Sequence, residues 1–161
     1  MGMSSDDMLR IPRNVWTVTS SELRDMWKDY PEFQEIFPDL LSNLDYDKAI
    51  VRAVEDFNDQ PPETDLAPHS FPHKGLLRKK AFCEVLRTVI LYHANNYFTG
   101  QSGGIQIPVH ERFQALQPML AALLAEVKEL EMRIKRKINT LNGFGTTNHY
   151  QALGYYGNRS R

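Results

Sequence analysis

An apolar residue recurs every three or four positions through the C-terminal half of the chain. The successive steps are 4, 3, 4, 3, 4, 3, 4 and 4 residues. This spacing places all members on one face of a single helix, so we predict an amphipathic helix over residues 109–141 that is the central helix of the fold. Pro118 lies inside this segment and should kink the helix or mark its true beginning. The members are Val109, Phe113, Leu116, Leu120, Leu123, Val127, Leu130, Ile134 and Ile138, of which Leu123, Val127 and Leu130 are expected to be buried.

Similar periodicity predicts two more main helices, over about 45–58 and 76–98, and a short one after residue 19. Thr19 and Glu22 have the spacing of a capping box, and Asp45 is the expected cap of the next helix. We therefore predict an all-α fold: a bundle of about three main helices plus short helices, with an extended N-terminal arm and a C-terminal tail. The inward-facing residues are expected to be Leu23, Met26, Trp27 and Tyr30; Tyr46, Ala49, Ile50, Ala53, Val54 and Phe57; and Leu77, Ala81, Val85, Leu86, Val89, Ile90, His93 and Tyr97.

The length of 161 residues suits one domain with one core. We expect an irregular arm over 1–18, the bundle over 19–142 and a tail over 143–161. Within the bundle, a short apolar segment over 33–41 should form a helical turn broken by proline. Residues 61–75 form a long Pro/His-rich loop, expected to be functional or part of an interface. Residues 99–108 form a second loop with a short strand.

No apolar run has the length of a membrane span, and the N-terminus lacks the pattern of a secretory signal, so we expect a protein made in the cytoplasm without a membrane partner.

The residues that usually carry catalysis or metal binding are sparse. Cys83 is the single cysteine and is expected to be a buried structural thiol. His69 and His73 are four apart, but neighbouring prolines break the helical face that would align them. The carboxylate pairs Asp45/Asp47 and Glu55/Asp56 are expected at a helix start or on exposed faces. Because no P-loop, GxGxxG, HExxH or GxSxG motif occurs, we expect neither an enzyme nor a cofactor or metal.

Charge is distributed unevenly along the chain. Residues 1–65 carry a net charge of -9, residues 66–131 carry +2 and residues 132–161 carry +6. The folded protein therefore either has opposite poles, which favour head-to-tail contact between copies, or mixes these charges on one surface. Two basic clusters are interpreted as solvated helix faces, with contact to DNA as the alternative. They are Arg78, Lys79 and Lys80, and Arg133, Lys135, Arg136 and Lys137.

The C-terminal tail combines four glycines with aromatic and arginine residues. Tyrosine and arginine commonly anchor protein interfaces, so we expect the tail to dock on a partner. The alternative is a tail folded back over the apolar face of its own bundle. The expected anchors are Phe144, Tyr150, Tyr155, Tyr156, Arg159 and Arg161.

The order and spacing of these features resemble the small helical neck proteins of tailed bacteriophages. The resemblance spans about residues 20–157 and includes the run from Ala49 to Pro62, with Ala53-Val54-Glu55-Asp56-Phe57-Asn58, and the Ser102-Gly103-Gly104 turn between two long helices. It continues through Lys137-Ile138-Asn139 at the end of the last helix and the Gly/aromatic tail. The Pro/His-rich loop and the segment 31–38 depart from the family pattern.

The resemblance implies a non-enzymatic virion protein of the neck, which joins head to tail as an adaptor or head-completion protein. By analogy with the family, roughly twelve copies would form a ring with heterologous contacts. The C-terminal extension would dock on the portal protein, with another neck or tail protein on the other side and DNA passing nearby. The alternatives are a tail-completion or baseplate protein, and a small regulatory protein that binds DNA through the basic end of the last helix.

Overall fold

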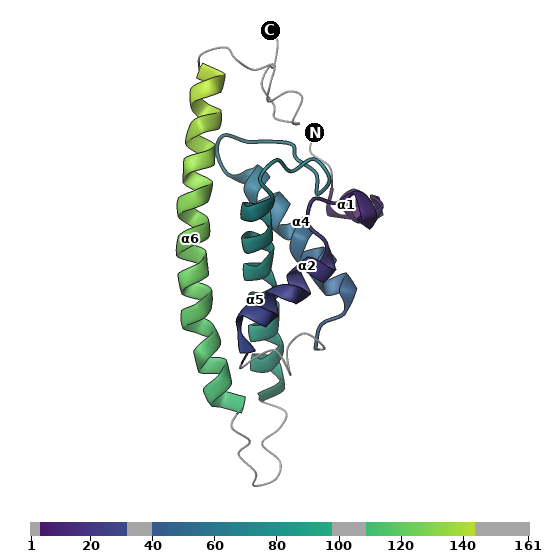
Figure 1. The fold of residues 1–161 in the computed structure, drawn as a ribbon, viewed down its shortest axis with the longest axis vertical. Helices are drawn as coiled ribbons and strands as arrows, with labels where there is room; N and C mark the ends of the chain where they lie inside the picture. Colours follow the sequence, from purple (N-terminus) through teal and green to yellow (C-terminus); the bar gives the residue numbers. More distant parts are fainter. Residues whose placement is uncertain (1–3, 32–39, 98–108, 144–161) are drawn as a thin grey trace.

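The computed structural model describes residues 4–31, 40–97 and 109–143, and every element of regular secondary structure in this part of the chain is a helix (Figure 1). Helices α4 and α5 pack together at the centre. Helix α6 lies along one side of α5, with α1 and α2 towards the other side. The predicted all-α bundle is therefore confirmed. The elements are α1 (Ser5–Arg10), η1 (Arg13–Val15), α2 (Ser20–Asp25), η2 (Met26–Asp29), α4 (Asn43–Asp59), α5 (Lys74–Tyr97) and α6 (Val109–Gly143).

Helix α4 begins earlier than predicted, because Ser42 rather than Asp45 is its N-cap. The Ser42 hydroxyl accepts a hydrogen bond from the Asp45 backbone N–H at 3.3 Å, and the Asp45 carboxylate accepts one from the Ser42 N–H at 2.9 Å. This reciprocal pair is a capping box and satisfies two donors that the first turn would otherwise leave free. The predicted apolar face of α4 is confirmed, since Tyr46, Ala49, Ile50, Ala53, Val54 and Phe57 are all buried.

The central helix is α5, not α6 as the periodicity suggested. Helix α5 packs against α2, α4 and α6, and its side chains are buried on several faces. Leu77, Ala81, Val85, Leu86 and Val89 are buried as predicted, and Ile90 is partly buried. Leu76, Lys80, Phe82 and Cys83 are buried as well, because a helix enclosed by others has no single inward stripe.

Helix α6 is continuous from Val109 to Gly143, so Pro118 lies inside the helix and does not mark its beginning. Of its predicted stripe, Val127 is buried, whereas Leu123 and Leu130 are only partly buried. The helix lies on the outside of the bundle and packs against α5 along one face, which leaves the opposite face to solvent.

The two short helical elements after residue 19 follow the prediction. The Thr19 hydroxyl accepts from the Glu22 N–H at 3.4 Å and the Glu22 carboxylate accepts from the Thr19 N–H at 3.2 Å, which confirms the capping box. Leu23, Met26 and Trp27 are buried, and Tyr30 is partly buried.

The N-terminal segment is not the irregular arm that we predicted. Residues 5–10 form α1, and Met8, Trp16 and Val18 are buried in the common core. The Thr17 N–H donates to the Pro68 carbonyl at 2.9 Å, which ties the segment to the loop before α5. The packed unit therefore starts by residue 5, ahead of the predicted boundary at 19. The predicted turn around 33–39, the strand at 105–107 and the tail from 144 onward lie outside the described residues.

Truncation of Met8 tests whether the N-terminal helix is an integral part of the core. Met8 is 1% exposed. We expect Met8→Ala to lower the free energy of unfolding by about 2 kcal/mol, because it removes buried apolar volume. Urea unfolding measures this loss. The neighbouring change Arg10→Ala, at an exposed position, should cost less than about 0.5 kcal/mol, and equal small losses in both variants would contradict the packing of α1.

Candidate functional site: a buried lysine network and an exposed basic strip on α6

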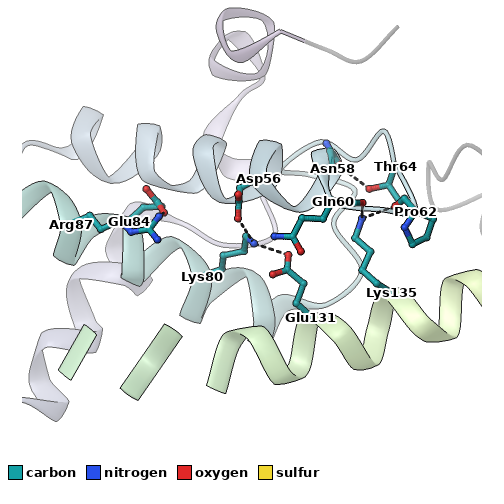
Figure 2. A network of polar contacts seen from close by, with 10 residues as sticks. All are labelled: Asp56, Asn58, Gln60, Pro62, Thr64, Lys80, Glu84, Arg87, Glu131 and Lys135. Carbon is teal, nitrogen blue, oxygen red and sulfur yellow. Dashed lines mark hydrogen bonds and ion pairs between the residues drawn. The ribbon is translucent and has the colours of Figure 1, made fainter. Parts of the chain in front are cut away.

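Lys80 joins three helices through its ammonium group. Its Nζ atom lies 2.6 Å from Glu131 Oε1 on α6 and 2.5 Å from Asp56 Oδ2 on α4 (Figure 2). The side chains of Lys80 and Glu131 are each 6% exposed, whereas that of Asp56 is 59% exposed. A buried ammonium is tolerated only when it is paired, so Lys80 fixes the lateral position of α4 and α6 on α5.

One helical turn further along α6, Lys135 binds the chain that leaves α4. Its Nζ donates to the carbonyl oxygens of Gln60 and Pro62, each at 2.8 Å, and lies 4.1 Å from the centre of the Phe57 ring (Figure 2). These carbonyls belong to the segment that follows Asp59, the last residue of α4. Lys135 therefore fixes the segment after α4 to α6.

Burial lowers the pKa of Lys135 to about 8 from an ordinary 10.5, with Lys80 acting in the same direction and Glu131 and Asp59 opposing. Between pH 8 and 10.5 the unfolded chain then holds one proton more than the folded chain at this site. The contribution of Lys135 to the free energy of unfolding therefore rises with pH between pH 8 and 10.5. The neutral amine keeps two N–H donors, so both carbonyls remain bonded.

The variant Lys135→Met isolates this effect. From pH 7 to pH 10.5, we expect the free energy of unfolding of the wild type to rise relative to the variant by up to about 3 kcal/mol. Urea titrations of the wild type and of the variant at several pH values measure the difference. The contributions of the other titrating groups cancel in this difference, because both proteins contain those groups. A difference that stays flat with pH would contradict the lowered pKa.

The long loop between α4 and α5 packs against the bundle. The Asn58 amide group donates to the Leu66 carbonyl at 2.9 Å, and its oxygen accepts from the Thr64 hydroxyl at 2.8 Å and the Leu66 N–H at 3.1 Å. Leu66 and Phe71 are buried, and the Phe71 ring meets that of Phe57 at 5.0 Å between centroids. The loop predicted to be functional or part of an interface therefore contributes to the subunit's own core.

Of the four predicted basic interface residues on α6, three are exposed. Arg133 pairs with Glu129 one turn earlier, with Arg133 Nη2 at 3.0 Å from Glu129 Oε1. Arg136 and Lys137 are exposed and form no ion pair within the described part of the chain. We call Arg133, Arg136 and Lys137 the basic strip. Lys135 does not belong to it, because its buried ammonium already binds the loop after α4.

The cluster at residues 78–80 is not the solvated face that we predicted. Lys79 forms an ion pair with Glu126, and Lys80 is buried in the network. Arg78 is the exposed residue of this cluster. Most of this cluster is therefore committed to contacts within the chain and is not available to a nucleic acid.

The remaining candidates are separated in the structure. His69 is exposed, and burial together with Lys137 lowers the pKa of the partly buried His73. Cys83 is buried, and this burial raises its pKa to about 11, as expected of a structural thiol. The structure brings no three metal-ligating residues together in its described segments. Phe144, Tyr150, Tyr155, Tyr156, Arg159 and Arg161 lie outside those segments.

Two of the predicted carboxylates have partners within the chain: Asp47 lies near the start of α4 as predicted but is buried, and Asp56 is exposed as predicted. Asp47 is buried, and its Oδ2 atom accepts from Arg13 Nε at 3.1 Å. Asp56 belongs to the lysine network. Sequence reasoning missed the network itself, although one signal was present: Glu131 and Lys135 follow Val127 in steps of four and so share its buried face.

The fold and this geometry define an all-α protein held together by a buried lysine network. Comparison of the sequence with known protein families and characterised proteins, and of the structure with solved structures, finds no match. Within the described segments, no helix has both the length and the apolar character needed to cross a membrane.

Proposed function

We propose that this chain is a virion structural protein of a tailed phage, a connector that forms a ring in the neck between the portal and the tail. The observation that carries the proposal is the separation of charge in the fold. The basic strip lies on α6, at one side of α5, whereas α4, with five acidic and two basic residues, lies on the other side of α5 (Figure 1). The sequence resemblance to phage neck proteins supplies the particular role.

Opposite charge on two sides suits a closed ring. In a head-to-tail interface each subunit presents one surface to its neighbour and a different surface to the next copy. A basic side facing an acidic side attracts the correct neighbour, and it disfavours contacts that place like charges together. The ring proposed here has roughly twelve copies by family analogy.

The lysine network suits such a subunit. Lys80 and Lys135 bind α4, α5, α6 and the loop after α4 to one another. Helices fixed in this way transmit force as one body. The role proposed is mechanical and requires no catalytic group, cofactor or metal.

Charge reversal tests whether the basic strip orients the copies. We expect Arg136→Glu with Lys137→Glu to weaken self-assembly, or docking on a partner, and to change the free energy of unfolding by less than about 1 kcal/mol, because exposed charges contribute little to stability. Sedimentation at low and high salt measures assembly. The matched control is Lys48→Glu with Arg52→Glu, which changes the same formal charge at two exposed positions on α4.

Unchanged assembly in the Arg136/Lys137 variant, or equal loss in both variants, would contradict the proposed orientation. The same strip favours the alternative of a DNA-binding regulatory protein. Tight, steeply salt-dependent DNA binding by the isolated chain would favour that alternative over the connector.

A further inference from the structure

Helix α6 has one face that no described part of the chain covers. It packs on α5 through the face that carries Val127, Glu131, Lys135 and Ile138, all of them buried, and Figure 1 shows it at the edge of the molecule. On the side away from α5, exposed residues recur in steps of three and four, which places them on one face of the helix. They are Ala122, Ala125, Glu129, Met132 and Arg136.

The charges on this side of α6 are ordered by sign. Glu126, Arg133 and Lys137 directly follow residues of that series and are exposed as well. We call the series and these three residues the outer face of α6. Its acids, Glu126 and Glu129, come before its bases, which are the basic strip. Glu129 and Arg133 form a pair within the helix, yet the side chain of each is 70% exposed, so both remain accessible to a partner.

An acidic segment followed by a basic one is complementary to the same face running in the opposite direction. In an antiparallel pair of identical helices, residues equally far before and after the centre lie opposite one another. With residue 131 at the centre, Glu129 lies opposite Arg133 of the partner subunit, and Glu126 lies opposite Arg136 of the partner subunit. Two-fold symmetry makes each of these contacts occur twice.

The uncharged residues of the outer face fit the same register. Met132 is 43% exposed and lies one residue from the centre, so the methionines of the two copies adjoin and bury each other. Ala122 and Ala125 are small, and small side chains at a contact let two helices approach closely. The neighbouring Lys128 has Ile134 opposite, a residue of the face that packs on α5, and so meets no like charge.

We propose that two copies of this chain pair through the outer faces of α6, antiparallel and about a two-fold axis near residue 131. A parallel pair places identical residues together, so that Glu129 meets Glu129 and Arg133 meets Arg133, and this repulsion excludes it. The antiparallel pair is isologous, because each copy contributes the same surface.

Other occupants fit the outer face less well. A nucleic acid binds through contacts between its phosphates and cationic side chains, and the acids Glu126 and Glu129 on the same face would repel it. An acidic protein surface would meet the same repulsion. Residues 144–161 of the chain itself contain no acidic side chain, so they offer no counter-charge to the basic strip. A second copy supplies both signs in the required order.

The pairing does not depend on the connector role, but its consequence for assembly rests on the proposed function. In the pair, Glu126 and Glu129 of the partner subunit cover the basic strip. The strip is then not free to face the acidic side of a neighbour in the ring. The pair is therefore a form that must open before the ring closes, and it regulates assembly by competing for the same charges.

A charge exchange tests the pairing. We expect Arg133→Glu and Glu129→Arg, each alone, to weaken dimerisation at least tenfold, because each replaces two attractive contacts with two repulsive ones. The double variant Glu129→Arg with Arg133→Glu exchanges the signs and should dimerise like the wild type. Sedimentation velocity of the full chain over a concentration series measures the mass, which distinguishes a dimer from a ring.

An equimolar mixture of the two single variants separates pairing from local effects. One variant has acids at both positions and the other has bases at both, so the mixture should recover the dimer although neither chain has the ion pair within its helix. The matched control is Lys28→Glu, which breaks an exposed ion pair with Asp25 away from α6 and should dimerise like the wild type. Far-UV circular dichroism and urea unfolding establish that each variant is folded.

Three results would overturn the pairing: a wild type that is monomeric at every concentration, single variants that dimerise like the wild type, or a mixture that stays monomeric. Each of them leaves the connector role standing. The connector role fails separately, if the chain is absent from the neck of the particle.

Discussion

Replacing Glu131 by leucine is expected to lower the free energy of unfolding by about 3–5 kcal/mol, because the buried Lys80 ammonium loses its buried counter-ion. The remaining partner, Asp56, is 59% exposed and therefore binds Lys80 from a solvated position. Leucine fills much of the volume of the glutamate side chain, so the loss reports the uncompensated charge rather than a cavity. Urea unfolding at pH 7 measures it.

The double variant Lys80→Met with Glu131→Leu separates charge from packing. When both partners become apolar, the penalty of the unpaired ion disappears, and we expect stability to return to within about 1 kcal/mol of the wild type. The matched control is Glu129→Leu with Arg133→Met, an exposed pair on the same helix that should contribute less than about 1 kcal/mol. Additive losses at Lys80 and Glu131 would contradict the network.

Phe82→Ala is expected to cause a loss of similar size, about 3–5 kcal/mol. Phe82 is fully buried on α5, and its ring meets that of Trp27 edge-on at 5.1 Å and stacks on that of Tyr30 at 6.1 Å between centroids. Trp27 is held in turn, because its indole N–H donates to the Tyr46 hydroxyl at 3.1 Å. The truncation removes the common contact of α5 with the short helical elements after residue 19.

Thermal and urea unfolding measure this loss, and Phe82→Leu serves as the control that keeps most of the apolar volume. The leucine variant should lose clearly less stability than the alanine variant. A loss below about 1 kcal/mol in Phe82→Ala would show that this part of α5 is not at the centre of the core.

Local periodicity predicted the helices well, because each one packs a repeated apolar face. The face of α4 from Tyr46 to Phe57 was predicted residue by residue. Its start was misplaced because both Ser42 and Asp45 are good caps, and the structure uses them together as a capping box.

The same reasoning fails where burial depends on distant partners. Along α6 it correctly selected Leu116, Val127 and Ile138, which are buried. Between the last two it selected Leu130 and Ile134, which are only partly buried, whereas Glu131 and Lys135 are buried. Charged residues are usually exposed. Glu131 is buried because it pairs with Lys80, and Lys135 is buried because it donates to the carbonyls of Gln60 and Pro62. Those partners lie 51 to 75 residues away, so no local pattern contains them.

The N-terminal segment shows a related limit. Trp16 and Val18 are only two residues apart, Met8 lies eight residues earlier, and a mixture of polar and apolar residues separates Met8 from Trp16, so the three set no helical or strand period. Met8 enters the core from α1, whereas Trp16 and Val18 enter it from the residues that follow η1. Their burial depends on the surface that α4 and the loop before α5 provide, and that surface exists only in the folded chain.

A cryo-EM map of the intact particle that contains this protein tests the connector role most directly. The account predicts density for the α4–α5–α6 bundle in a closed ring between the portal and the tail, with the basic strip of each copy facing the acidic side of its neighbour. Absence of the bundle from the neck, whether it is found elsewhere in the particle or not in the particle at all, would contradict the account.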